Sequence, residues 1–153
     1  MTDQIHIHAK AAFQSWGSSV QRACHSMLVQ QGIQNGSLTV VLTDEDTIRQ
    51  MNLEFAGEDH VTDVLSFPFD ELDPENGLRY LGDIIIAVPV AQRQSESNGN
   101  ELEHELCLLA IHGTLHLLGY DHAEDDAKKR MWELQDQVLI QLGIGDNLKP
   151  DRK

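Results

Sequence analysis

The chain has 153 residues, and its 41% hydrophobic and 24% charged residues are typical of a globular domain rather than a disordered or fibrous protein. Eleven Lys and Arg against 25 Asp and Glu give a net charge of −14, which repels polyanions at long range and argues against nonspecific nucleic-acid binding. DNA is therefore not an expected partner, and any RNA contact has to be local or assisted. No linker divides the chain, so residues 1–153 are predicted to form one domain.

The sequence carries no signal for a membrane or for secretion. No segment approaches the run of about 20 apolar residues that spans a bilayer, and the start MTDQIHIHAK lacks a basic and apolar leader. We therefore expect a cytoplasmic protein with no membrane partner. Cys24 and Cys107 are the only cysteines, and their apolar neighbours predict two buried free thiols.

The first half of the chain has the element pattern β-α-β-α. Residues 5–7 alternate as in a strand, and a helical spacing of apolar residues follows up to Gly32. Residues 37–43 form a β-branched run that predicts a second strand. Thr43 and Asp46 make a capping-box signature for the helix that comes next.

The second half adds two strands and three helices. The two strands are predicted at residues 63–69 and 81–88. The first of the three helices is predicted to begin at Pro89, and the other two to span residues 101–118 and 124–142. The consecutive apolar residues at 84–88 predict a strand covered on both faces. Residues 143–153 read as a polar tail. Together the pattern predicts a single α+β domain, in which a small mixed four-stranded sheet packs with about five helices.

A histidine cluster in the sequence HGTLHLLGYDH predicts a metal site. His112 and His116 are four residues apart, so they share one helix face one turn apart, as in zincin-like metal-binding helices. Gly119 lets the chain turn back and bring His122 toward the pair. Three imidazoles with an open fourth position are the layout of catalytic zinc. We predict one Zn²⁺ ion here, although Ni²⁺ or another divalent metal would also accept three imidazoles.

The residues around the histidines leave the catalytic groups unassigned. The spacing matches the metal-binding half of the metzincin protease signature, but Gly113 stands where those proteases carry a glutamate base. Peptide hydrolysis is therefore disfavoured, and no general base or nucleophile is identified. Asp121 adjoins His122, and its carboxylate could fix an imidazole tautomer; equally, it could only cap the turn after Gly119.

Three blocks of sequence, HGTLHLLGYDH, TDVLSFPFDE at 62–71 and LGDIIIAV at 81–88, resemble the YbeY family of bacterial rRNA maturation factors. The resemblance covers about residues 37 to 142. It implies a metal-dependent endoribonuclease that selects single strands and acts in rRNA processing and ribosome quality control. It also implies ribosomal RNA and ribosome-associated proteins as partners. The candidates for the wall of its substrate cleft are Thr62, Asp63, Ser66 and Phe67, whose alternative role is simple strand packing.

The chain departs from the family where a phosphate contact is expected. Ala56 follows Phe55, whereas the family usually has an arginine after the aromatic residue. An arginine there would offer a bidentate grip on a phosphodiester, so its loss puts RNA affinity or catalytic efficiency in doubt. The best substitutes are Lys128, Lys129 and Arg130. Their alternative role is a solvated helix face, paired at i, i+4 spacing with Glu124, Asp125 and Asp126.

Two other functions therefore stay open beside the endoribonuclease. A non-catalytic, zinc-binding, ribosome-associated factor is favoured by Ala56 and by the charge of −14. A zinc hydrolase acting on a substrate other than RNA is the weaker alternative, because Gly113 removes the usual base for peptides.

Overall fold

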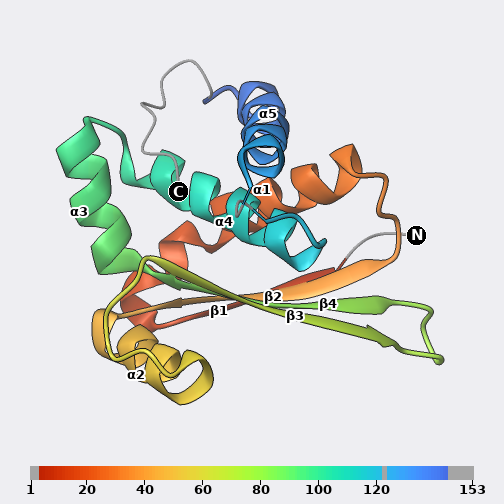
Figure 1. Ribbon diagram of the computed structural model, residues 1–153, viewed down its shortest axis with the longest axis horizontal. Helices are drawn as coiled ribbons and strands as arrows, with labels where there is room; N and C mark the ends of the chain where they lie inside the picture. Colours follow the sequence, from red (N-terminus) through yellow and green to blue (C-terminus); the bar gives the residue numbers. More distant parts are fainter. Residues whose placement is uncertain (1–3, 122–123, 145–153) are drawn as a thin grey trace.

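The computed structural model describes residues 4–121 and 124–144, which form a four-stranded sheet between two helical layers (Figure 1). The elements in chain order are β1 (Gln4–Ala9), the 3-10 helix η1 (Ala11–Trp16), α1 (Gly17–Gln30), β2 (Gly36–Thr43), α2 (Glu45–Ala56), β3 (Val64–Leu72), β4 (Arg79–Ala87), α3 (Val88–Asn98), α4 (Leu102–Leu117) and α5 (Asp125–Gln141). Helices α1, α4 and α5 lie on one side of the sheet, and α2 lies on the other. Within the predicted tail, residues 145–153 lie outside the described part.

The strand order is β1-β2-β4-β3, and the sheet is mixed. β1 and β4 both run parallel to β2, whereas β3 pairs with β4 in the antiparallel sense. β3 is thus an edge strand, which is where Pro68 is tolerated, because an edge strand leaves one side of its backbone unpaired. The predicted α+β class and mixed four-stranded sheet are confirmed.

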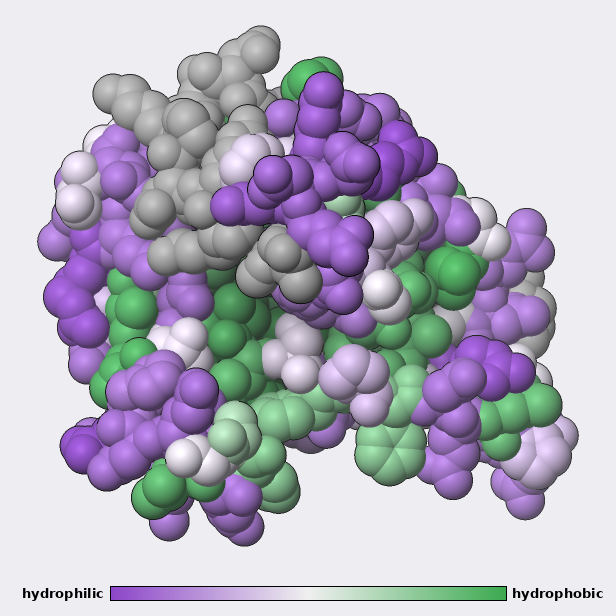
Figure 2. All heavy atoms as spheres, in the orientation of Figure 1, coloured by the Kyte–Doolittle hydropathy of each residue, from purple (hydrophilic) through white to green (hydrophobic). Residues whose placement is uncertain are grey.

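The main core lies between the sheet and the helices α1 and α4. Side chains alternate along each strand, so Ile84 and Ile86 of β4 belong to the large core, while Ile85 and Ala87 pack with Ile48 of α2. Both faces of β4 are covered, as the apolar run predicted. Figure 2 shows hydrophobic residues in the band between the helical layer and the sheet, and hydrophilic residues gathered over α5.

Helix α2 starts one residue later than its capping-box signature implied. Thr43 is buried as the last residue of β2, where it pairs with Ala87 of β4. The helix N-cap is Asp44, whose Oδ1 accepts a hydrogen bond of 2.8 Å from the backbone N–H of Thr47. The assignment of Thr43 as the cap was therefore wrong, because its backbone is already committed to the sheet.

Both cysteines are buried and free, as predicted. Burial raises the pKa of the Cys24 thiol to about 12 and that of Cys107 to about 11. Neither thiol is therefore an available nucleophile or metal ligand at neutral pH. No helix in the described residues is both long enough and apolar enough to cross a bilayer.

Candidate metal centre and adjoining cleft

Helix α4 is buried almost all round, since the sheet, α1, α3 and α5 surround it. Gly113 lets it approach β4 closely. A Cβ at this position would lie 2.8 Å from Cγ2 of Ile84, which is shorter than carbon atoms tolerate. Position 113 therefore faces the sheet, and a glutamate base of the metzincin kind has no room there.

His112 and His116 converge at the C-terminal end of α4. Their Nε2 atoms are 2.9 Å apart, and their ring planes cross at 77°. His112 is buried, with 5% of its surface exposed, whereas His116 is half-buried. The four-residue spacing on one helix face thus brings the two ring nitrogens to a common point.

This nitrogen pair fits a divalent metal ion. Two ligands of a tetrahedral zinc ion, each about 2.0–2.1 Å from the metal, stand about 3.3 Å apart. The observed separation of 2.9 Å is close to that value, so a small opening of the rings would admit an ion. His122, the predicted third ligand, lies outside the described residues. Among residues 4–121 and 124–144, no three His, Cys, Asp or Glu side chains gather in a metal-binding group.

Gln135 of α5, which was not among the predicted site residues, contacts the other nitrogen of His112. Its Oε1 lies 2.8 Å from Nδ1 of His112, and only 3% of Gln135 is exposed. A usable signal was present in the sequence. Position 135 falls on the apolar stripe of α5, beside Met131, Leu134 and Val138, where a polar residue needs a partner.

A cavity of about 500 Å³ opens beside the two histidines. It is lined by the start of β3, the end of α4 and the turn that follows, namely Thr62, Asp63, Val64, Leu65, Ser66, Pro68, His112, His116, Gly119, Tyr120 and Asp121. The structure therefore brings Thr62, Asp63, Ser66 and Asp121 together with the histidines. Phe67, the remaining cleft candidate, packs on the opposite face of the sheet with its ring 5.6 Å from that of Phe55. Strand alternation separates Phe67 from Ser66.

Asp63 is held firmly at the wall of this cavity. Only 8% of the residue is exposed, and its backbone carbonyl accepts a hydrogen bond from the N–H of Ala87. Its Oδ1 accepts from the hydroxyl of Thr62 at 3.4 Å, and its Oδ2 accepts from Nε2 of Gln94 at 3.3 Å. Both carboxylate oxygens are thus oriented, one by Thr62 in the segment before β3 and the other by Gln94 of α3.

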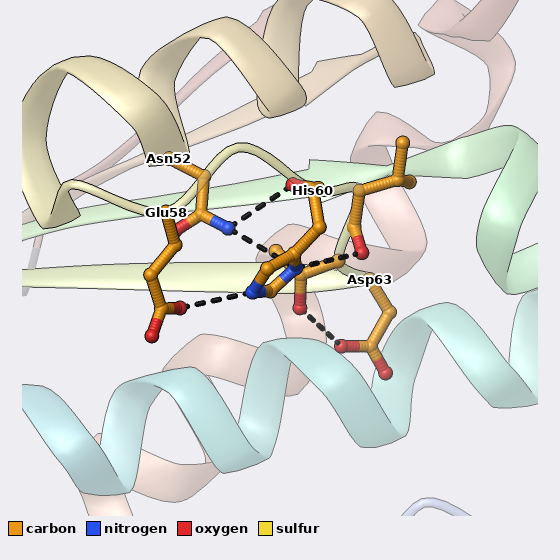
Figure 3. Close-up of polar contacts among 6 residues, drawn as sticks. Asn52, Glu58, His60 and Asp63 are labelled. Atoms are coloured by element: carbon orange, nitrogen blue, oxygen red, sulfur yellow. Dashed lines mark hydrogen bonds and ion pairs between the residues drawn. The ribbon is translucent and has the colours of Figure 1, made fainter.

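Ala56, where the family resemblance leads us to expect an arginine, is the last residue of α2, and the loop that leads to β3 follows it. Figure 3 shows the His60 side chain between Asn52 and Glu58. Asn52 donates from Nδ2 to the carbonyl of His60 at 3.1 Å, and Nε2 of His60 lies 3.0 Å from Oε2 of Glu58. The nearby guanidinium of Arg49 pairs with Asp59 at 2.8 Å. The loop is therefore organised by contacts with acidic side chains rather than by a cation directed at a phosphate.

The predicted RNA-contact cations lie at the start of α5 and do not line the cavity. Lys128 packs over the ring of Trp132 at 5.0 Å, and Arg130 forms an ion pair of 3.7 Å with Glu133. Lys129 is exposed. A role of these three residues in RNA contact stays a prediction.

Comparison with known proteins identifies the family. Residues 2–143 match the family model described as "Endoribonuclease YbeY". The chain belongs to the YbeY endoribonuclease family. The YbeY match begins far before residue 37, where the sequence resemblance was expected to start.

Curated YbeY relatives are similar over most of their length. The protein named Endoribonuclease YbeY of Staphylococcus saprophyticus is 39% identical over 142 residues, which cover 90% of this chain and 93% of the relative. Its namesake in Persephonella marina is 42% identical over 121 residues, covering 78% and 79%. The solution structure of TM1509 from Thermotoga maritima is 28% identical, with a TM-score of 0.65 over 98% of this chain and 100% of that one.

Proposed function

We propose that this chain is a cytoplasmic, metal-dependent endoribonuclease that cuts single-stranded RNA during rRNA processing and ribosome quality control. The observation that carries the proposal is the convergence of the His112 and His116 Nε2 atoms at 2.9 Å beside a cavity lined in part by residues 62–66. Membership of the YbeY family supports the reaction class. His122 is proposed as the third ligand, and Zn²⁺ as the metal, with Ni²⁺ as the alternative.

The residues of the chain would bind and orient the substrate around the metal. A bound Zn²⁺ ion would supply Lewis-acid stabilisation to a phosphodiester oxygen and lower the pKa of water. Asp63 presents a carboxylate whose orientation is set by Thr62 and Gln94, so it can accept a proton or a hydrogen bond at a defined place. Ser66 adds a hydroxyl to the same wall. A buried carboxylate that is already oriented, as that of Asp63 is, favours catalysis because it needs little reorganisation.

The size of the cavity supports an unpaired substrate. Its volume of about 500 Å³ lies within the range of small-molecule sites, which is about 300–1,000 Å³. A single strand can place one nucleotide in such a cavity, whereas a paired nucleotide must first leave its stack. Ribosome-associated proteins are proposed partners, because a chain of charge −14 needs help to approach RNA.

One alternative has an observation in its favour. The loop after Ala56 pairs its histidine and its neighbouring arginine with acidic residues, and so offers no replacement for the family's phosphate contact. A non-catalytic ribosome-associated factor, in which the metal stabilises the fold, is consistent with that loop. A zinc hydrolase acting on peptides is disfavoured, because position 113 faces Ile84 instead of the cavity.

The proposal is tested with zinc-loaded protein, its His116→Ala variant and a His104→Ala control. His104 lies on the same helix but pairs with Glu101 at 3.2 Å, away from the cavity. Single-stranded and duplex rRNA fragments are incubated with each protein, and metal content is measured by elemental analysis. We expect His116→Ala to lose both zinc and cleavage, and His104→Ala to keep both. Fully zinc-loaded protein that leaves single strands intact would favour the non-catalytic factor.

A further inference from the structure

Helix α5 supplies one buried amide to the end of α4 where the histidines converge. Gln135 sits on a stripe that otherwise carries Met131, Leu134, Val138 and Leu139 into the core. An amide without a hydrogen bond is costly in such surroundings, and a leucine would pack there at no such cost. The Oε1 atom of Gln135 lies 2.8 Å from Nδ1 of His112, a contact that spans 23 residues of sequence. The oxygen of the buried amide therefore has the histidine as its partner.

The chemistry of this contact determines which nitrogen of His112 carries the proton. A carbonyl oxygen only accepts hydrogen bonds, so the Nδ1 that faces it must donate. In a neutral imidazole the lone pair then stands on Nε2. Nε2 is the atom that lies 2.9 Å from Nε2 of His116. The amide thus prepares the nitrogen that faces the proposed ion.

We propose that Gln135 is a positioning residue for the metal: it holds His112 as the Nδ1–H tautomer, fixes the ring about its axis and directs Nε2 at the ion. This inference rests on the proposed function, since it takes His112 as a ligand. α5 thereby sets metal affinity from outside the histidine motif. Asp121 was predicted as a candidate for the same kind of role beside His122, whereas the proposed role of Gln135 concerns a different histidine and uses an uncharged group.

Two substitutions separate hydrogen bonding from packing. Gln135→Met keeps a similar length and removes the acceptor, whereas Gln135→Glu keeps an acceptor and adds charge. We expect the methionine variant to bind Zn²⁺ about 10–100-fold more weakly, the usual cost of losing a group that orients a metal ligand. The glutamate variant is expected to bind at least as tightly as the wild type. Gln137→Met is the matched control, because Gln137 is an exposed residue of the same helix that bonds to Gln30.

The measurements are Zn²⁺ affinity by competition with a chelator, and ¹⁵N NMR of the histidine side chains in the metal-free protein. In the wild type, His112 should show a protonated Nδ1 and an unprotonated Nε2. In Gln135→Met the two tautomers of His112 should mix, while thermal unfolding remains cooperative. A protonated Nε2 in the wild type would overturn the inference even if every variant failed to fold. Zinc affinity unchanged in a folded Gln135→Met protein would overturn it as well.

The same titrations distinguish a failure of this inference from a failure of the proposed function. Loss of zinc in His116→Ala together with unchanged zinc in Gln135→Met contradicts only the role of Gln135. Unchanged zinc in both variants contradicts the metal site itself. If zinc binding is lost in His116→Ala and weakened in Gln135→Met, but the wild type does not cleave RNA, the role of Gln135 is supported and the proposed ribonuclease activity is contradicted.

Discussion

Gly113 determines how closely the histidine-bearing helix lies against the sheet. A Cβ built at this position would meet Cγ2 of Ile84 at 2.8 Å, and Cγ1 and Cδ1 of the same side chain at 3.1 and 3.2 Å. Ile84 is fully buried in β4, so it has little freedom to move aside. The glycine next to His112 is thus explained by packing, and the absent protease base follows from the same contact.

We expect Gly113→Ala to lower the free energy of unfolding by about 1–3 kcal/mol, because the added methyl overpacks the core. In an Ile84→Ala background that space is open. There the same change should be neutral, or stabilising by up to about 1 kcal/mol, since alanine favours a helix over glycine. Urea unfolding of the four proteins measures both effects. Equal destabilisation in the two backgrounds would contradict the proposed contact.

At the scale of elements, Asp44 joins the start of α2 to the end of β1. Its carboxylate caps the helix through the N–H of Thr47 and pairs with Lys10, the residue that follows β1. The hydrogen bond and charge of Lys10, with the help of Thr47, lower the pKa of Asp44 to about 2 from an ordinary 3.8. The carboxylate is therefore more easily kept ionised in the folded chain than in the unfolded chain.

We expect the contribution of this charge to stability to be complete above about pH 4 and to disappear as the pH falls toward 2. The sign follows because the folded pKa is the lower one, so the unfolded chain takes up the proton first. Asp44→Asn keeps a capping oxygen and removes the charge. It should be less stable than the wild type by about 0.5–1 kcal/mol at pH 7, a value reduced for the pair's partial exposure. Urea titrations at several pH values should show this difference closing, and a difference independent of pH would count against the ion pair.

The order of the elements and the boundaries of strands and helices could largely be predicted from the sequence. The side of the sheet toward which an individual side chain points could be predicted only in part. β3 illustrates the limit. The block TDVLSF was predicted to line a cleft, yet Ser66 reaches the cavity while Phe67 packs against Phe55 on the other face. Strand alternation predicts that Ser66 and Phe67 point to opposite faces of the sheet. Which of the two residues points toward the histidines depends on which face α4 packs against and which face α2 packs against.

At the scale of the whole molecule, the surface charge limits how RNA is approached. A net charge of −14 repels a polyanion, so cations must act locally. The cluster at the start of α5 combines an exposed Lys129 with Lys128 and Arg130, which contact Trp132 and Glu133. A weak, salt-sensitive contact with RNA is the most that three cations can supply on such a surface.

Replacing Lys128, Lys129 and Arg130 together by glutamine is expected to weaken binding of single-stranded RNA and to leave zinc content unchanged. Each lost phosphate contact reduces the slope of log K against log salt by about 0.7, so three contacts would reduce it by about 2. The matched control removes the same charge elsewhere, with Arg22, Arg49 and Arg79 each changed to glutamine. Filter binding at several salt concentrations measures the slopes, and equal slopes in both triple variants would argue against a specific patch.

The sequence by itself determined what depends on neighbours along the chain. The pairing of His112 with His116 follows from the geometry of one helical turn, and the burial of β4 follows from its unbroken apolar run. The family also follows from short ordered blocks. Each of these properties is carried by residues close together in sequence, where spacing alone constrains geometry.

Only the tertiary structure decided which residues far apart in sequence meet. The contact of Gln135 with His112 depends on how α5 packs on α4, and that of Gly113 with Ile84 depends on how α4 lies on β4. Asp63 likewise meets Gln94 only because α3 follows directly on β4, whose last residue Ala87 donates to the Asp63 carbonyl. Packing of whole elements sets these contacts, since the rotation of a helix about its axis and its depth on a sheet are collective results of many buried side chains.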